Sequence, residues 1–161
     1  DVGGLVASTL NIRNDDFLAG RYIFSRDPGS PANASVINEG LIRARDNGYV
    51  VLAGDYAANR GVIEARLGTV ALASGAKVTL DMQGDSLINL AVNEKTVAEL
   101  AGVANSGELN AEGGRVMMTA AVARDLAGTV VNNSGVVRAR GTVEKDGAIY
   151  LVGDGGDVAS S

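Results

Sequence analysis

Cysteine, histidine and tryptophan are all absent from the 161 residues of the sequence. The lack of the first two excludes disulfide frameworks, Cys/His zinc sites, Ser-His-Asp triads and Cys-His nucleophile pairs. Any catalytic site would therefore have to use carboxylates, tyrosine, lysine or serine. A secreted protein without disulfides also needs another source of stability, and a long repeated core can supply it.

Aromatic residues and proline are scarce as well. Four tyrosines and two phenylalanines make up 4% of the chain, although 46% of its residues are hydrophobic. The apolar residues are thus mainly aliphatic, which suits a narrow interior built from thin repeated layers. Two prolines stand against 22 glycines, and glycine is the residue that tight turns favour. The composition predicts short segments joined by many turns.

An excess of positive charge is missing too, since the net charge is −5 and the isoelectric point is near 4.7. Nucleic acids and anionic membranes bind clustered lysine and arginine, so we expect neither as a partner. No apolar run approaches the ~18–20 residues of a membrane span, so membrane insertion is not expected. The first residues show no signal-peptide pattern, as expected if the sequence starts after such a peptide.

A repeat is the main positive feature. Four segments read Asn, any residue, Gly, any residue, aliphatic, polar, Ala, polar, and they are residues 38–45, 59–66, 105–112 and 133–140. Each is followed by a unit that starts at glycine and alternates apolar residues, namely residues 48–52, 68–72, 114–118 and 147–151. The repeat unit is therefore a pair of short strands.

Alternate side chains of a strand share a face, so the repeat predicts which residues point inward. The first strand contributes an aliphatic column and an all-alanine column, the latter being typical of a tight corner. The second strand contributes two more aliphatic columns. The predicted inward columns are Ile42, Ile63, Leu109 and Val137; Ala44, Ala65, Ala111 and Ala139; Val50, Val70, Val116 and Ile149; and Leu52, Leu72, Met118 and Leu151.

The repeat asparagines are separated by 21, 46 and 28 residues. About 20 residues per rung suits a coil of short strands. We therefore expect the 46-residue interval to hold roughly two rungs, which include strand-like residues 77–82 and 87–92. The 28-residue interval would carry an insertion at residues 120–129, and the fourth unit a loop at residues 140–146.

The repeat asparagines themselves, Asn38, Asn59, Asn105 and Asn133, have two interpretations. Stacked asparagine side chains can hydrogen-bond along a column, and asparagine also tolerates left-handed turn geometry. Their identical placement before Gly and the aliphatic-x-Ala strand favours a ladder over four ordinary turn residues.

Outside the repeat the pattern is looser. Residues 3–12 indicate a strand pair, residues 17–24 an aromatic hairpin outside the coil, and residues 27–31 a turn. A short helix is an alternative only at residues 92–100.

These motifs together resemble the N-terminal secretion domain of two-partner secretion exoproteins of the filamentous haemagglutinin type. The resemblance runs through Gly-Gly-Leu-Val-Ala-Ser-Thr at residues 3–9, Asp-Phe-Leu-Ala-Gly at 16–20, the Asn-x-Gly repeats, residues 68–72 and residues 113–116. It implies a single all-β domain over residues 1–161, a right-handed parallel β-helix or solenoid with extra-helical hairpin or loop insertions.

The same resemblance implies a function and partners. The chain would be recognised by an outer-membrane transporter of a Gram-negative bacterium, through type V secretion, and would nucleate β-helix folding during export. It would lead an adhesin, haemolysin or contact-inhibition protein, of a kind linked to virulence and biofilms, to the cell surface or medium. A host or matrix glycan receptor would bind other parts of the full protein. The family's capping segment and Asn-Pro-Asn-Gly motif do not precede Asp1, so we expect the C-terminal part of that domain, without its N-terminal cap region.

We expect no catalytic, cofactor-binding or metal-binding residues. The outward columns are more simply a solvated face with cross-rung ion pairs than a binding stripe, and they contain Arg43, Glu64, Asn110 and Arg138, then Arg45, Arg66, Glu112 and Arg140. Residues 153–157 resemble one calcium-binding Gly-Asp turn, but such cages need repeated copies. Residues 33–35 and 132–134 match glycosylation sequons that arise often by chance.

The rival function is a carbohydrate-binding or polysaccharide-degrading β-helix protein, since a fold alone does not determine function. A hydrolase needs two carboxylates ~5–10 Å apart in one groove. The acids here are scattered without a shared column: Asp15, Asp16, Asp81, Asp85, Glu94 and Glu99.

Overall fold

The computed structural model describes residues 2–31, 33–82, 88–123, 129–139, 148–154 and 157–161. Nearly all of its regular structure is β-strand, with one short helix, α1 (Asn14–Leu18). Three sets of strands pair in parallel and a fourth set pairs antiparallel. The predicted all-β class with parallel sheets is therefore confirmed.

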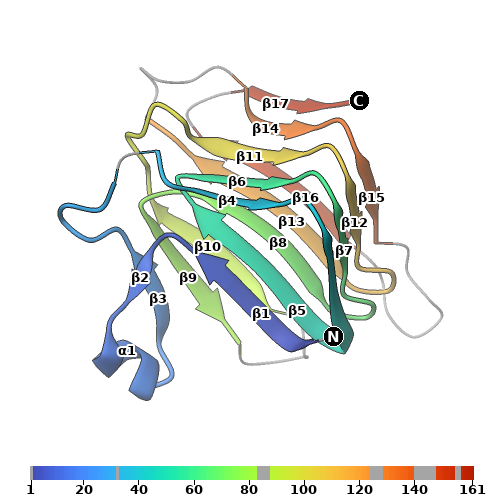
Figure 1. Ribbon diagram of the computed structural model, residues 1–161, viewed down its shortest axis with the longest axis horizontal. Coiled ribbons are helices and arrows are strands. Elements are labelled where there is room, and N and C mark those ends of the chain that lie inside the picture. Colours follow the sequence, from blue (N-terminus) through green and yellow to red (C-terminus); the bar gives the residue numbers. More distant parts are fainter. Residues whose placement is uncertain (1, 32, 83–87, 124–128, 140–147, 155–156) are drawn as a thin grey trace.

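The parallel strands form a coil in which each rung supplies one strand to each of three faces (Figure 1). Sheet I contains β4 (Ser35–Asn38), β6 (Tyr56–Asn59), β11 (Gly102–Asn105), β14 (Thr129–Asn133) and β17 (Asp157–Ser160). Sheet II contains the first part of β5 (Leu41–Gly54), then β7 (Val62–Glu64), β12 (Glu108–Asn110) and β15 (Val136–Arg138). Sheet III contains β1 (Val2–Ser8), the second part of β5, β8 (Thr69–Ser74), β13 (Arg115–Ala121) and β16 (Ala148–Asp154).

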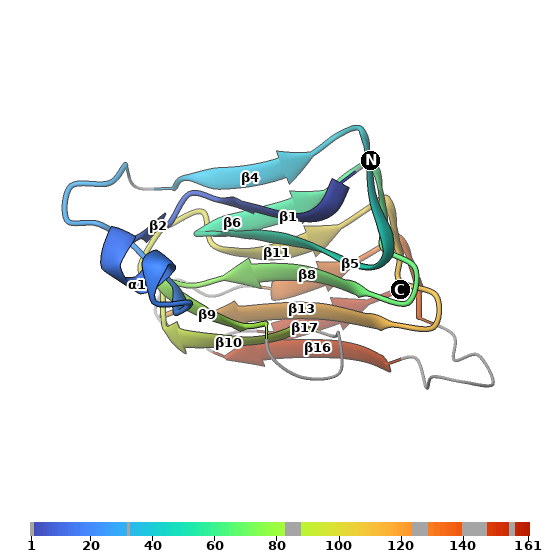
Figure 2. The ribbon, with the colours of Figure 1, turned by 90° about the horizontal axis from the view of Figure 1, so that it is seen from below.

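Figure 2 shows these strands stacked from β1 and β4 at one end to β16 and β17 at the other. Because β5 runs through the corner between sheets II and III, hydrogen bonds join the two into one eight-stranded sheet. Each rung therefore contacts mainly the rung before it and the rung after it, as in other solenoids.

The predicted inward columns are confirmed by the strand register. Ile63 pairs with Ile42 on one side and with Leu109 on the other, and Leu109 pairs with Val137. Val50, Val70, Val116 and Ile149 are also mutual neighbours, as are Leu52, Leu72, Met118 and Leu151. The alanine column is buried in all four rungs. Apart from Ile149, which is 49% exposed, these side chains belong to one continuous core along the inside of the coil.

The asparagine ladder is confirmed as well. The side-chain amide of Asn38 donates to Oδ1 of Asn59 at 2.8 Å, Asn59 donates to Asn105 at 2.9 Å, and Asn105 donates to Asn133 at 2.8 Å. All four residues are buried. Each amide that would lose water on burial thus finds a partner in the neighbouring rung, so its desolvation is compensated.

The prediction of two rungs in the 46-residue interval is wrong. β6 pairs directly with β11, and β7 pairs directly with β12, so the interval holds a single rung. The two extra strand-like runs are β9 (Lys77–Asp81) and β10 (Asn89–Glu94), which pair antiparallel with each other. Alternating apolar residues indicate a strand but not its partner, which is why the pattern did not distinguish a hairpin from a rung.

β9 and β10 belong to an antiparallel sheet IV, which also contains β2 (Asn11–Ile12) and β3 (Tyr22–Ser25). Sheet IV lies outside the coil and covers the outer face of sheet III, where it forms a second core. That core contains Val51 and Ala71 from the coil together with Val78 and Leu80 from β9. The predicted extra-helical position of the aromatic segment 17–24 is confirmed, because β3 lies in sheet IV and α1 lies beside it (Figure 1).

Three local predictions need correction or completion. The alternative helix at residues 92–100 is wrong, because β10 extends to Glu94 and the residues after it form an isolated bridge at Thr96 and a bend at 99–100. The helix occurs instead at α1, whose first turn contains Asp15 and Asp16, where carboxylates interact favourably with the helix dipole. Residues 3–12 do contain two strands, but β1 pairs with β5 and β2 pairs with β3. The predicted loop at 140–146 lies outside the described residues, as do residues 124–128 of the insertion predicted at 120–129.

Candidate functional site

The outward columns of sheet II contain cross-rung ion pairs. Arg43 contacts Glu64 in the next rung at 2.6 Å, and Arg138 contacts Glu108 at 3.1 Å. A further pair joins Arg66 to Asp46. All of these side chains are at least one third exposed, so each pair contributes only ~0–1 kcal/mol. The structure thus favours the interpretation of the outward columns as a solvated face. Arg140, which belongs to one of these columns, lies outside the described residues.

The other sequence motifs do not converge on a site. No three carboxylates lie close enough to hold a metal ion within the residues that the structure describes. Residues 155–156 of the Gly-Asp turn, and Asp85, lie outside that part of the chain. Asp16 pairs with Arg21 and Glu94 with Lys77, while Asp81 lies at the opposite end of the β9–β10 hairpin from Glu94. The side-chain Oδ1 of Asn33 accepts the backbone N–H of Leu100 at 2.8 Å, and Asn132 is exposed.

The structure contains a buried polar junction at Asp55 that the sequence patterns did not predict. Asp55 is 1% exposed, and its carboxylate contacts the guanidinium of Arg26 and accepts the Thr96 hydroxyl at 2.6 Å. Its carbonyl oxygen accepts the Ser74 hydroxyl at 2.5 Å and the Gly102 N–H at 3.1 Å. Arg26 directly follows β3, so the junction ties sheet IV to the corner of the coil. Every polar group has a structural partner, which identifies a structural clamp rather than a reactive site.

Sequence reasoning could not find this junction because its residues lie in no repeat and are separated by 29 and 41 positions from Asp55. A weak signal does exist. Asp55 follows the apolar strand end Val51-Leu52-Ala53-Gly54 without a break, and a carboxylate beside a buried strand needs a partner.

A largely apolar groove lined by aromatic side chains, the aromatic groove, lies on the described surface. It has a volume of about 480 Å³ and is lined by Val6, Ile12, Phe17, Tyr22, Phe24, Tyr49 and Met82. The rings of Phe17 and Tyr22 meet edge to face, with centroids 6.2 Å apart. Phe17 is 58% exposed and the neighbouring Leu18 is 82% exposed. Exposed aromatic side chains of this kind are enriched where proteins bind one another.

No helix among the described residues is both long and apolar enough to cross a membrane.

No protein-family model matches the chain, and no curated protein matches its sequence. The crystal structure of the HMW1 secretion domain from Haemophilus influenzae matches it with a TM-score of 0.75 at 28% sequence identity.

The match covers 98% of this chain and 41% of the other chain. The resemblance to a two-partner secretion domain is confirmed. The similarity thus includes sheet IV as well as the coil, since almost every residue is aligned. This chain spans about two fifths of the length of the secretion domain that it matches.

Proposed function

We propose that this chain is a segment of the secretion domain of a large bacterial adhesin or related surface protein. Its partner is an outer-membrane transporter of the two-partner pathway, and its destination is the cell surface or the medium. The observation that supports this most is the match over 98% of the chain to a secretion domain, which includes the extra-helical sheet as well as the coil. The coil itself is a right-handed parallel β-helix, the hand that parallel crossovers strongly favour.

The repeated contacts suggest how such a segment assists export. Each rung buries its aliphatic and alanine side chains against the rungs beside it, and each ladder asparagine bonds to the next. A folded rung therefore offers the next segment of chain a ready surface, so folding proceeds by addition of rungs. Folding of this kind outside the cell would draw the chain outward without a chemical step. The proposal assigns no catalytic residue and no cofactor to this segment.

Binding of a receptor, including a host or matrix glycan, belongs in this proposal to other parts of the full protein. A carbohydrate-degrading function receives no support from the described carboxylates. Asp16 and Glu94 are each engaged by a neighbouring cation.

The aromatic groove and α1 are the surface that we assign to recognition by the transporter. Removal of Phe17 and Leu18 costs little stability because both are exposed, yet it removes the apolar area that a partner would bury. The test is export of the parent protein by its transporter, with wild type compared with F17S/L18S. Val97→Ser is the control, since Val97 is exposed but does not line the groove.

We expect the double variant to lower the amount of protein outside the cell, while Val97→Ser and the wild type export equally. Equal export of all three proteins would show that the transporter does not recognise the aromatic groove. Undiminished export after deletion of the transporter would overturn the proposed function itself.

A further inference from the structure

A polar hollow lies on the outer face of sheet III, beside the edge of sheet IV. It has a volume of about 280 Å³ and is lined by Asn89 of β10, Arg115 and Met117 of β13, and Tyr150 of β16. β10 is an edge strand of sheet IV, and it packs against β13. The hollow is therefore bounded by three strands of the described chain, on the side of the coil and not at its end.

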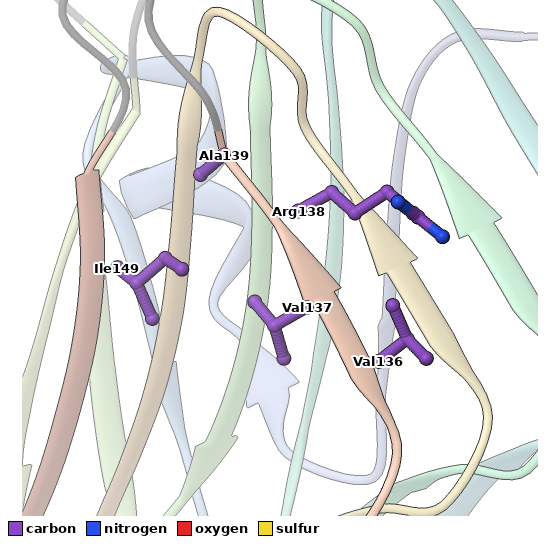
Figure 3. Close-up of a pocket in the computed structure, with 5 residues that line it drawn as sticks. All are labelled: Val136, Val137, Arg138, Ala139 and Ile149. Carbon is purple, nitrogen blue, oxygen red and sulfur yellow. The ribbon is translucent and has the colours of Figure 1, made fainter.

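Tyr150 lines this hollow because side chains alternate along β16. Figure 3 shows the side chain of the preceding residue, Ile149, directed toward those of Val137 and Ala139, which belong to the interior of the coil. Successive side chains of a strand point to opposite faces, so Tyr150 points outward, and its residue is 46% exposed. Met117, its partner in β13, packs against the second core. The tyrosine ring and the methionine side chain form the apolar wall of the hollow.

Arg115 supplies the charge of the hollow, and two contacts hold its guanidinium in place. Its Nη1 donates a hydrogen bond to Oδ1 of Asn89. The guanidinium also lies over the ring of Tyr150, 5.9 Å from the ring centroid, at the distance of a cation–π contact. One contact comes from sheet IV and the other from sheet III. The orientation of the guanidinium is therefore set before any ligand binds, which lowers the entropic cost of binding.

The Nε–H of Arg115 is buried and has no hydrogen-bond acceptor among the residues that the structure describes. Other arginines of the outer faces, including Arg43, Arg66 and Arg138, each contact a carboxylate of another rung. Arg115 contacts the neutral amide of Asn89 instead. Buried donors are nearly always paired in native proteins, so the open donor indicates that an acceptor from outside the described chain completes the site.

The atoms around the hollow define the chemistry of that acceptor. Since Asn89 engages Nη1 of Arg115, the edge formed by Nε and Nη2 remains for a ligand, and a carboxylate fits such an edge with two parallel hydrogen bonds. The Nδ2 amide of Asn89 is a donor for a hydroxyl oxygen. Tyr150 and Met117 offer apolar surface between these polar groups. A carboxylate, hydroxyl groups and an apolar ring face occur together in a uronic acid.

We propose that this hollow binds one hexuronic acid unit of an acidic polysaccharide, with the carboxylate on Arg115 and the sugar ring against Tyr150. The site goes beyond the secretion role and is separate from the receptor binding that is assigned to other parts of the parent protein. No carboxylate is among the described residues that line it, so the unit is bound and not cleaved.

The affinity of this site is limited by its size and by one neighbouring charge. Asp81 is the register partner of Asn89, so a negative charge lies at the same edge of sheet IV and weakens the binding of an anion. A single sugar acid has few atoms with which to gain binding energy. We therefore expect a dissociation constant of about 1 mM for the free monosaccharide.

The test titrates the protein with D-glucuronate, and with acetate and D-glucose as probes of the carboxylate alone and the sugar ring alone. Nuclear magnetic resonance follows the Nε–H of Arg115 and the ring of Tyr150. We expect glucuronate to shift both signals, acetate to bind about tenfold more weakly, and glucose not to bind. Arg115→Lys keeps the charge but loses the planar edge, so it should weaken glucuronate binding at least about tenfold. Arg45→Lys is the matched control, since Arg45 is exposed on sheet II and does not line the hollow.

Equal affinities for acetate and glucuronate would overturn the proposal, because the hollow would then recognise an anion and not a sugar acid. Absence of a shift at Arg115 at every glucuronate concentration would also overturn it, as would unchanged binding by Arg115→Lys. Circular dichroism of each variant verifies that the coil is folded in these comparisons. Export is not measured here, so failure would leave the proposed secretion role intact.

Discussion

Asn59 donates its side-chain amide to Oδ1 of Asn105, a residue 46 positions further along the chain, and accepts the amide of Asn38, 21 positions before it. The same amide nitrogen also lies 3.1 Å from the carbonyl oxygens of Gly61 and Glu108. One completely buried side chain therefore satisfies polar groups in three successive rungs.

Replacement of Asn59 by alanine should lower the free energy of unfolding by roughly 1–3 kcal/mol, because the partners left behind are buried without hydrogen bonds. Urea denaturation followed by circular dichroism measures the change. Asn14→Ala is the control, since Asn14 is exposed and lies outside the coil. Coincident curves for Asn59→Ala and the wild type would show that the ladder contributes nothing to stability.

Ala65→Leu should destabilise the coil by roughly 1–3 kcal/mol, because its added volume meets Ala44 and Ala111 in a packed column. Val62→Leu adds a methylene group on the outward side of the same strand and should have a much smaller effect. The urea midpoints of the two variants decide this. Equal midpoints would show that the loss of stability does not depend on whether the enlarged side chain points into the coil or out of it.

Asp55→Asn should cost about 3–5 kcal/mol, the usual effect of removing one partner from a buried ion pair. Asp46→Asn, which breaks the exposed pair with Arg66, should cost no more than about 1 kcal/mol. A double-mutant cycle with Arg26→Met tests the cause, since the two effects at the junction should be strongly non-additive. Additive effects would show that Arg26 does not interact energetically with Asp55.

Val51→Lys places a charge between sheet III and sheet IV, where Val51 is completely buried. Because the coil has its own core, we expect sheet IV to lose protection while β6 and β11 keep theirs. Hydrogen exchange resolved by residue measures both regions. Ile37→Lys on the exposed outer face of sheet I serves as the control. Equal loss of protection throughout the coil would show that the two cores unfold together.

The coil could be predicted in detail because its columns occur four times. A single Ile-x-Ala strand is ambiguous, whereas the recurrence of Ile42, Ile63, Leu109 and Val137 before an alanine identifies the inward face of every copy. The ladder followed from the same recurrence, since Asn59 and Asn105 precede identical Gly-x-aliphatic patterns.

Sheet IV occurs once, so no recurrence indicated the partners of its strands. A trace of sheet IV is visible in the sequence of the coil, because Val51 and Ala71 point outward and yet are apolar. Strands that are buried on both faces have continuous apolar sequences, so the apolar runs 50–53 and 70–73 are typical of strands covered on their outer face by another layer. The Asp55 junction depended on that layer and could not be inferred without it.

The rung that includes β9 and β10 spans 46 residues between its asparagines, the rung before it spans 21, and both stack at the same hydrogen-bonded spacing. Each rung advances the axis by about 4.8 Å whatever its residue count. The length of the coil is therefore counted in rungs and not in residues. The chain inserted at the corner after β8 adds bulk to the side of the coil without adding to its length, so the spacing along the axis is preserved.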